Sequence, residues 1–224
     1  MSNPIIRPML IGAAIGAGYG FLTQPKTPRR VFFSFHYQND IWRVNQVKNH
    51  YVTKGDQQAA GYFDGSLAEK AKREGAAVVK KLIDDGLNGS SVLCVLIGSE
   101  TYARHWVAYE IFKSIELGKG VFGVHIHGLQ DQHRNTTAKG QNPFEYLGYG
   151  TDDTKTKMVP YTRVTGSWVQ YPDCTPITAA AAAYLKTGTK PVLSELFPVY
   201  DWAIDDGFNN FASWASKAAT HALR

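Results

Sequence analysis

SVLCVLIGSETYARHWVAYEIFKSIELGKG, residues 91–120, is the stretch of sequence that decides the fold. It begins with the apolar run Ser91–Ile97, which has the length and composition of a strand buried on both faces. Gly98 ends this run, and a short polar loop then leads into a helical pattern. In open α/β sheets such loops lie at the carboxyl ends of the strands, where ligands bind. The stretch therefore predicts a buried strand, a loop at a ligand-binding edge and a helix.

Trp106 and Glu110 lie four residues apart in the helical part of this stretch. That spacing places the indole and the carboxylate on one face of the helix, near its start. A carboxylate beside a large apolar ring at a ligand-binding edge can have its pKa raised and take part in chemistry. Alternatively, Trp106 belongs to the core and Glu110 is a solvated surface residue. The pair alone leaves both interpretations open.

Strands and helices alternate along the first part of the chain. The predicted order β-α-β-α-β-α-β is typical of a parallel sheet with helices on both faces, an α/β fold. Besides the central stretch, the predicted strands are Val31–Phe35, Ala59–Phe63 and Val121–Gly128, and the predicted helices are Ile41–Tyr51 and Gly75–Leu87.

The pattern loosens after Gly128. We predict a further strand at Val164–Tyr171 and a helical turn or two in the alanine-rich stretch Ile177–Leu185. An amphipathic helix over Trp202–Leu223 closes the chain. The residues expected on or near one face of this last helix are Ile204, Phe208, Phe211, Trp214 and Ala218.

Size and composition indicate one medium-sized globular domain, alone or with appendages, because the chain has 224 residues of which 44% are hydrophobic. The net charge of +5 is spread along the chain and no nucleic-acid-binding motif occurs, so we expect no nucleic-acid partner. Cys94 and Cys174 form no disulfide framework, which favours a reducing compartment and a cytoplasmic location.

Residues 8–22 carry no charge and are rich in glycine and alanine. Gly12, Gly16 and Gly20 recur every four residues, a spacing that lets helices approach closely. A short membrane anchor, an oligomerisation helix and a disordered leader all remain open. We therefore divide the chain into an N-terminal segment with its linker, residues 1–29, and a folded domain with a C-terminal extension, residues 30–224.

Five stretches together carry a resemblance to a known family. They are VFFSFHYQNDIWRVNQVKNH (31–50), VLIGSETYARHWVAYEI (95–111), GVHIHG (123–128), KGQNPF (139–144) and YDWAIDDGFNN (200–210). In order and spacing they resemble the Toll/interleukin-1 receptor (TIR)-like subunit of the Thoeris antiphage system, the ThsB family. The resemblance implies a flavodoxin-like TIR fold.

The resemblance also implies an activity and its partners. Family members cleave NAD at the nicotinamide–ribose bond and make a cyclic ADP-ribose-type signal. This diffusible nucleotide activates a downstream effector during phage infection, after a phage-derived trigger. NAD is then a substrate, and we expect no bound cofactor and no metal ion. Self-association and membrane attachment through residues 8–22 are further expectations.

The W-x-x-x-E motif of the family corresponds to Trp106–Glu110, so the resemblance makes Glu110 the catalytic residue. The family's nucleotide pocket uses the end of the first strand and the following loop, and residues of the next strand–helix loop are close by. The residues expected to bind NAD are Phe35, His36, Asn39, Asp40, Ser99 and Trp106.

Simpler roles compete for several of these residues. Asn39 or Asp40 can cap the helix that follows the first strand, and Ser99 can cap the third helix. Arg43 or Arg104 can meet the pyrophosphate of NAD, although solvated arginines are common near helix starts.

Two other function classes stay open. A non-catalytic TIR-like adaptor would act by self-association and partner binding. A metal-dependent hydrolase would use His125 and His127, which alternate on a predicted strand, with Asp131 and His133 beyond. Irregular ligand spacing disfavours the metal site, and histidines bonded to neighbouring loops explain the pattern as well.

Overall fold

A computed structural model describes residues 29–53, 58–62, 74–178, 185 and 192–222. Residues 1–28 of the predicted N-terminal segment and linker lie outside these ranges, as does the alanine run 179–184. The division at residue 30 and the three interpretations of residues 8–22 therefore stay predictions. Within the described residues, no helix is both long enough and apolar enough to span a membrane.

The main sheet has five strands in the order β2-β1-β3-β4-β9, and every neighbouring pair is parallel. This is the flavodoxin-like arrangement 2-1-3-4-5, and it confirms the predicted α/β class. A fifth strand, β9, joins the four that the sequence predicted. The strands are β1 (Arg30–Ser34), β2 (Gln58–Tyr62), β3 (Val92–Ile97), β4 (Gly120–His125) and β9 (Val199–Asp201).

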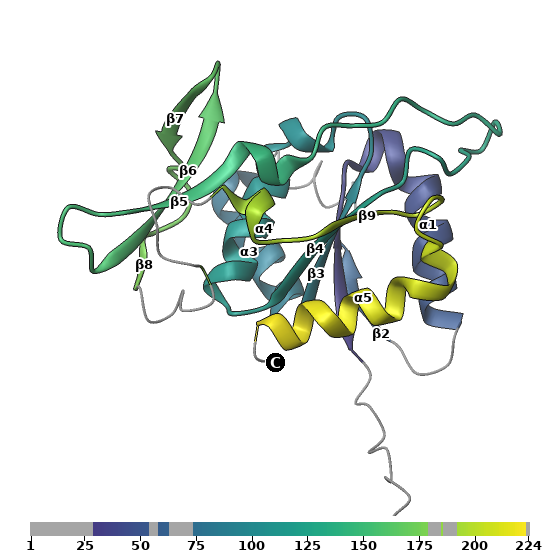
Figure 1. Ribbon diagram of the computed structural model, residues 1–224, viewed down its shortest axis with the longest axis horizontal. Coiled ribbons are helices and arrows are strands. Elements are labelled where there is room, and N and C mark those ends of the chain that lie inside the picture. Colours follow the sequence, from purple (N-terminus) through teal and green to yellow (C-terminus); the bar gives the residue numbers. More distant parts are fainter. Residues whose placement is uncertain (1–28, 54–57, 63–73, 179–184, 186–191, 223–224) are drawn as a thin grey trace, which may run out of the picture.

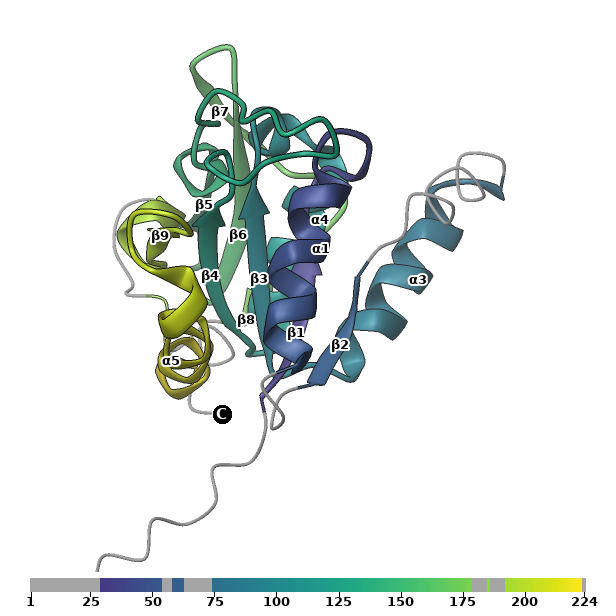
Figure 2. The ribbon, with the colours of Figure 1, turned by 90° about the vertical axis from the view of Figure 1, so that its right-hand side faces the viewer.

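Helices cover both faces of this sheet (Figures 1 and 2). On one face α1 (Tyr37–Thr53) and α5 (Gly207–His221) pack against β1, β3 and β4. On the other face lie α3 (Ala76–Asn88) and α4 (His105–Glu116). A short 3-10 helix, η1 (Thr101–Ala103), precedes α4. The sheet is thus the middle of three layers, as the alternating pattern predicts.

The core is centred on β3. All six of its residues are fully buried, because the strand lies between β1 and β4 and under helices on both sides. Alternate residues of β3 contribute to the two apolar clusters: Leu93, Val95 and Ile97 face α3 and α4, whereas Val92, Cys94 and Leu96 face α1 and α5. The predicted buried central strand is confirmed.

A small antiparallel sheet is inserted between β4 and β9, and it packs beside α4 (Figure 1). Phe112 of α4 meets the ring of Tyr149 edge-on, and the hydroxyl of Tyr171 donates to the carbonyl of His105. The predicted strand at 164–171 is wrong in its bounds, since a turn at Thr165 and Gly166 separates two strands there. The small sheet comprises β5 (Leu147–Thr151), β6 (Lys157–Val164), β7 (Ser167–Gln170) and β8 (Ile177–Thr178), and the short helices η2 (Pro143–Tyr146) and η3 (Leu193–Glu195) flank it in sequence.

The closing helix begins later than predicted. Asp201 accepts hydrogen bonds from the backbone N–H groups of Ala203 and Ile204, which holds a turn after β9. Asp206 has a left-handed backbone (φ 49°), and α5 starts only at the next residue. Ile204 therefore lies in the turn and is exposed, and Phe208, in the first turn of α5, is exposed as well instead of facing inward. The buried face of α5 consists of Phe211, Trp214, Ala215, Ala218 and Ala219.

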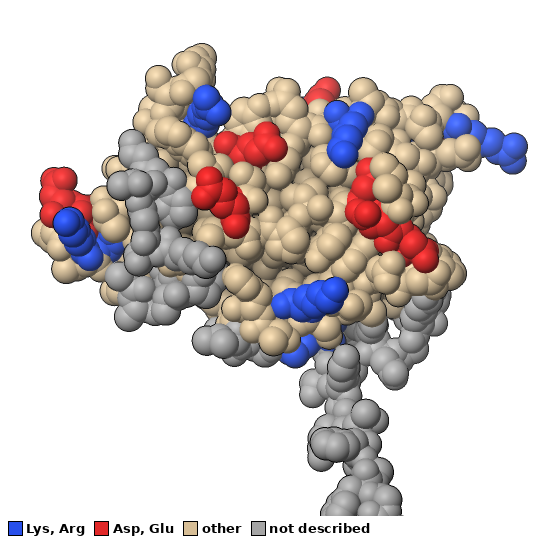
Figure 3. Space-filling model, in the orientation of Figure 1, with Lys and Arg blue, Asp and Glu red and all other residues tan. Residues whose placement is uncertain are grey.

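Charged side chains of both signs are interspersed on the face shown in Figure 3. Basic residues do not gather there into the extended patch or stripe that nucleic-acid binding proteins present.

Gly120 is a position at which backbone packing requires glycine. A Cβ atom there would lie 2.4 Å from the backbone carbonyl carbon of Ala218, so α5 would have to move off β4. We expect Gly120→Ala to lower the free energy of unfolding by about 2 kcal/mol. Gly89→Ala is the matched control, because its Cβ would meet only the flexible end of Arg30 at 3.2 Å. Urea unfolding that ranks the two variants equally would contradict this account.

Candidate functional site

The carboxyl ends of β1 and β3 form the edge at which the predicted site residues lie. β1 and β3 are parallel neighbours, with Ser34 opposite Val95. The segments that follow them, 35–40 and 98–104, therefore start side by side, and α4 brings Glu110 back over the sheet. Sites of this kind occupy the edge between the first and third strands in flavodoxin-like sheets.

Glu110 is buried among apolar side chains, with 2% of its surface exposed. The alternative that it is a solvated surface residue is wrong. Burial raises the pKa of the Glu110 carboxyl to about 8, because a charged carboxylate loses its hydration there. A fully buried, perturbed carboxyl at a ligand-binding edge is the kind of group that functional sites contain.

Ser34 is the polar neighbour of Glu110. It is the last residue of β1 and is fully buried, and it shares a sheet face with Phe32, the face covered by α4. Its side chain favours the charged form of Glu110 and so lowers the pKa of that carboxyl in part, although the hydroxyl makes no hydrogen bond of regular geometry. We did not predict Ser34 as a site residue, although one polar residue in the apolar run Val31–Phe35 was a visible signal.

His36 lies beside two charged residues, Glu100 and Arg104. Its Nδ1 lies 3.9 Å from an Oε atom of Glu100, which in turn pairs with Arg104. Burial and the nearby Arg104 guanidinium lower the pKa of His36, whereas Glu100 acts in the opposite direction. His36 is thus a neutral ring at physiological pH, half-buried beside the loop that leads into α4.

Asp40 is fully buried against the end of β3. A Cβ atom on Gly98 would lie 2.0 Å from an oxygen of the Asp40 carboxyl group, so the carboxyl rests directly on the backbone there. Burial raises the pKa of Asp40 to about 6, while Arg43 at 3.6 Å acts to lower it. Neither carboxyl oxygen has a hydrogen-bond partner within the described ranges.

Arg43 is not available to a pyrophosphate. It is 4% exposed and donates to the backbone carbonyls of Leu129, Asn39 and Asn135, which ties α1 to the loop after β4. The expectation of a solvated arginine is also wrong for this residue. Arg104 is partly exposed at the start of α4 and pairs with Glu100.

The other residues predicted to bind NAD differ in their exposure and in their neighbours. Phe35 is half-buried with its ring 6.3 Å from that of Tyr37, and Ser99 lies in the turn after β3. Trp106 packs on the apolar cluster under α4 and meets the ring of Tyr109 edge-on. Asn39 is exposed on α1, and its backbone carbonyl accepts a hydrogen bond from Arg43.

The predicted helix caps are wrong. α1 begins at Tyr37, with only two residues between it and the end of β1, so Asn39 and Asp40 lie inside its first turn rather than before it. The residue before α4 is Arg104, and no side chain caps that helix, so Ser99 does not do so.

The two histidines of the metal interpretation lie at the end of β4. The strand ends at His125, so His127 lies beyond it, and the two rings are 5.9 Å apart. Across the residues that the structure describes, no group of three or more His, Cys, Asp or Glu side chains is arranged to hold a metal ion.

The sheet order, the layer arrangement and the W-x-x-x-E glutamate on the helix after β3 define a TIR-like α/β domain. Residues 32–131 match the family described as "Thoeris protein ThsB, TIR-like domain". The chain is also 48% identical over 191 residues to the "Putative cyclic ADP-D-ribose synthase ThsB1" of Bacillus cereus (strain MSX-D12). That alignment covers 84% of this chain and 99% of the relative. The chain therefore belongs to the Thoeris ThsB family of TIR-like proteins.

Burial of Glu110 predicts a pH-dependent cost to stability. The carboxyl titrates at about 8 in the folded protein and near 4.5 when unfolded. Between these values the folded state keeps a proton that the unfolded chain has released, so wild-type stability falls as pH rises. We expect the stability advantage of Glu110→Gln to grow by roughly 1.4 kcal/mol per pH unit across that range.

Urea unfolding of both proteins at several pH values between 5 and 8 measures this difference. A gap between the two proteins that does not change with pH would mean that Glu110 is not a buried, protonated group.

Proposed function

We propose that the protein cleaves NAD at the nicotinamide–ribose bond and converts the remaining ADP-ribose into a cyclic signal. The observation that carries the proposal is Glu110, a buried carboxyl at the ligand-binding edge within a W-x-x-x-E sequence. The name of the 48% identical relative, "Putative cyclic ADP-D-ribose synthase ThsB1", supports the same substrate class.

The chemistry asks for one well-placed carboxylate. Cleavage of this bond develops positive charge on the ribose, and the leaving nicotinamide is already a cation, so it needs no acid to leave. In its ionised form Glu110 would stabilise that charge and orient the ribose hydroxyls. A low-dielectric position strengthens this interaction, which is a reason to bury a catalytic carboxylate.

Burial also sets the state of Glu110 before substrate arrives. With a pKa of about 8, the carboxyl is mostly protonated at neutral pH in the free protein. The cationic nicotinamide ring of NAD would favour the charged form, since an opposite charge nearby lowers the pKa of a carboxyl. Substrate binding would therefore produce the carboxylate that the reaction uses.

Cyclisation further requires that water be kept from the reacting ribose while another group of the same molecule attacks it. The half-buried rings of Phe35 and Trp106 are suited to stack on the bases of NAD and to exclude water. We propose that the cyclic product then activates a separate effector during phage infection, after a phage-derived trigger.

Replacing the carboxyl of Glu110 tests the proposal. We expect Glu110→Gln to reduce release of nicotinamide and of cyclic product by about 100-fold or more, because the amide cannot carry the balancing charge. The full-length protein is incubated with NAD, with and without extract of phage-infected cells, and the products are identified by mass. Glu116→Gln, a partly exposed residue at the far end of the same helix that pairs with Lys113, should keep wild-type activity.

No turnover of NAD under either condition would favour the non-catalytic adaptor instead. Undiminished turnover in Glu110→Gln would remove Glu110 from the mechanism.

Ser34 gives a second test through the pH profile. Activity that needs ionised Glu110 should rise with pH, and kcat/KM should approach its plateau above pH 8, since burial raises the pKa of the free carboxyl to about 8. Ser34→Ala removes the neighbour that favours the charged form, so we expect the rising limb to move to higher pH by about half a unit or more. Ser90→Ala, a buried serine at the opposite edge of the sheet, is the control. If kcat/KM of Ser34→Ala rises over the same pH range as that of the wild type, the role of Ser34 is contradicted.

A further inference from the structure

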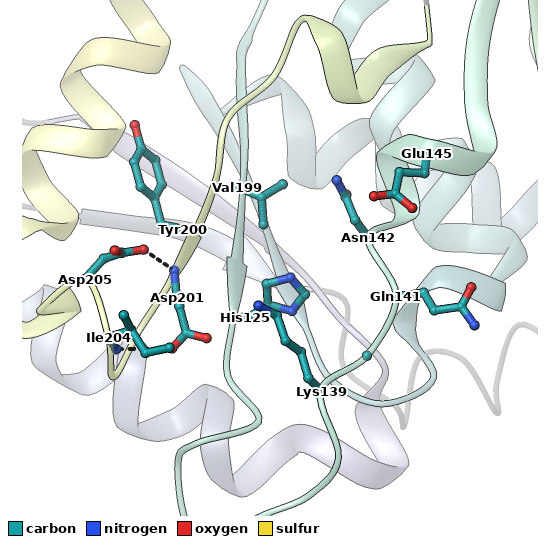
Figure 4. A pocket seen from close by; sticks show the side chains of 11 residues that line it. His125, Lys139, Gln141, Asn142, Glu145, Val199, Tyr200, Asp201, Ile204 and Asp205 are labelled. Atoms are coloured by element: carbon teal, nitrogen blue, oxygen red, sulfur yellow. Dashed lines mark hydrogen bonds between the residues drawn. The ribbon is translucent and has the colours of Figure 1, made fainter.

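A second cavity lies at the carboxyl ends of β4 and β9, and it holds none of the residues predicted to bind NAD. Its volume of about 490 Å³ is in the range of small-molecule sites. One wall consists of the ends of the two strands and the turn after β9, and segment 139–145 forms the other (Figure 4). It is therefore a separate opening on the same edge of the sheet, the edge where α/β folds bind ligands.

His125 and Asp201, the last residues of the two strands, face this cavity (Figure 4). Both are more than nine-tenths buried, with exposed fractions of 7% and 6%. Within the part of the chain that the structure describes, neither Nδ1 of His125 nor Oδ2 of Asp201 has a hydrogen-bond partner. Nδ1 of His127 lies 3.6 Å from that oxygen, which is too far for a hydrogen bond.

The Asp201 carboxyl is held in place with one oxygen left over. Its Oδ1 accepts from the N–H groups of Ala203 and Ile204 at 3.1 and 3.2 Å, and its own N–H donates to Asp205. Because buried polar groups are rarely left without partners, the remaining oxygen indicates a ligand group in the cavity.

The charges around the cavity select the class of ligand. Asp201, Asp205 and Glu145 supply three carboxylates that disfavour a phosphate, whereas Lys139, whose side chain runs beside the His125 ring, disfavours a cation (Figure 4). Burial and Lys139 lower the pKa of His125 to about 4, so the ring is neutral and can both donate and accept. Hydroxyl groups, which donate and accept at once, match this mixture of partners.

We propose that this cavity binds a neutral sugar or nucleoside through a pair of neighbouring hydroxyls, one bonded to Asp201 and the other to His125. The opposite wall, with Glu145 and the Asn142 amide, reaches the rest of the ligand. Ribose also occurs in NAD, but the pyrophosphate of NAD would meet the three carboxylates. The site is thus for an unphosphorylated ligand and does not depend on the proposed cleavage of NAD.

Adenosine is a probe with the required diol. The full-length protein, labelled with ¹⁵N-histidine, is titrated with adenosine, 2′-deoxyadenosine, AMP and glycine, and the ring signal of His125 is assigned through His125→Gln. Adenosine should shift this signal saturably. The deoxynucleoside, which lacks one hydroxyl, should bind about tenfold more weakly. AMP should also bind more weakly, and glycine, a zwitterion, should not bind.

Two variants test the walls of the cavity. Asp201→Asn keeps the Oδ1 acceptor of the turn but replaces the open oxygen by an amide, and Glu145→Gln changes an exposed residue of the opposite wall. Each should weaken adenosine binding about fivefold or more. Glu195→Gln, exposed and away from the cavity, should not.

Equal binding of adenosine and 2′-deoxyadenosine, tighter binding of AMP, binding of glycine or an unmoved His125 signal would each overturn the proposal. So would adenosine binding that neither Asp201→Asn nor Glu145→Gln weakens. Loss of NAD cleavage together with adenosine binding in Asp201→Asn would place the cavity within the NAD site and overturn its separate role. Failure of NAD cleavage in the wild type leaves these binding results unaffected.

Discussion

The close contact of backbones at the end of β3 is the constraint on which the ligand-binding edge depends. Gly98 carries no side chain, and the Asp40 carboxyl of α1 occupies the space where a Cβ atom would be. On another side Gly140 packs so tightly that a Cβ there would lie 1.8 Å from the Gly98 carbonyl oxygen. Three segments far apart in sequence therefore meet at one backbone position, and the loop after β4 is fixed over the edge of the sheet.

Titratable groups at this edge are also buried by the fold itself. The pKa is raised to about 8 for Glu110 and to about 6 for Asp40, because each carboxyl is removed from water. Such burial costs stability, since the ionised form of each group is poorly solvated. The fold tolerates this loss of stability because β3 and the helices on both faces supply a large apolar core.

The sequence predicted the parts of the fold that have a strong local pattern. β3 was recognised as a continuous apolar run, and α3 and α4 by helical spacing and their flanking glycines. β9 was missed because Val199–Asp201 is three residues long and only its pairing with β4 makes it a strand. The caps were misassigned at Asn39 and Asp40 because α1 already starts at Tyr37, with only two residues between it and the end of β1. Tertiary packing decides this early start and local propensity does not.

The candidate site was predictable to a similar degree. Glu110 could be named from the W-x-x-x-E spacing and the family resemblance, but its burial depends on the way α4 lies on the sheet. Ser34 and the pair His125 and Asp201 needed the structure, because each acts through a neighbour more than 50 residues away in the chain.

The two halves of the edge differ in chemistry although they share one geometry. Beside β1 and β3 the buried Glu110 lies among apolar side chains, which suits the proposed role of a group that carries charge only when substrate is present. Beside β4 and β9 the cavity is lined by carboxylates, a lysine and a neutral histidine, which suits hydroxyl groups. The rings of Tyr102 and Tyr146 lie 5.2 Å apart and join η1, which leads into α4, to η2, which carries Glu145. The cavity wall that carries Glu145 thus packs directly against η1, the segment that leads into the helix of Glu110.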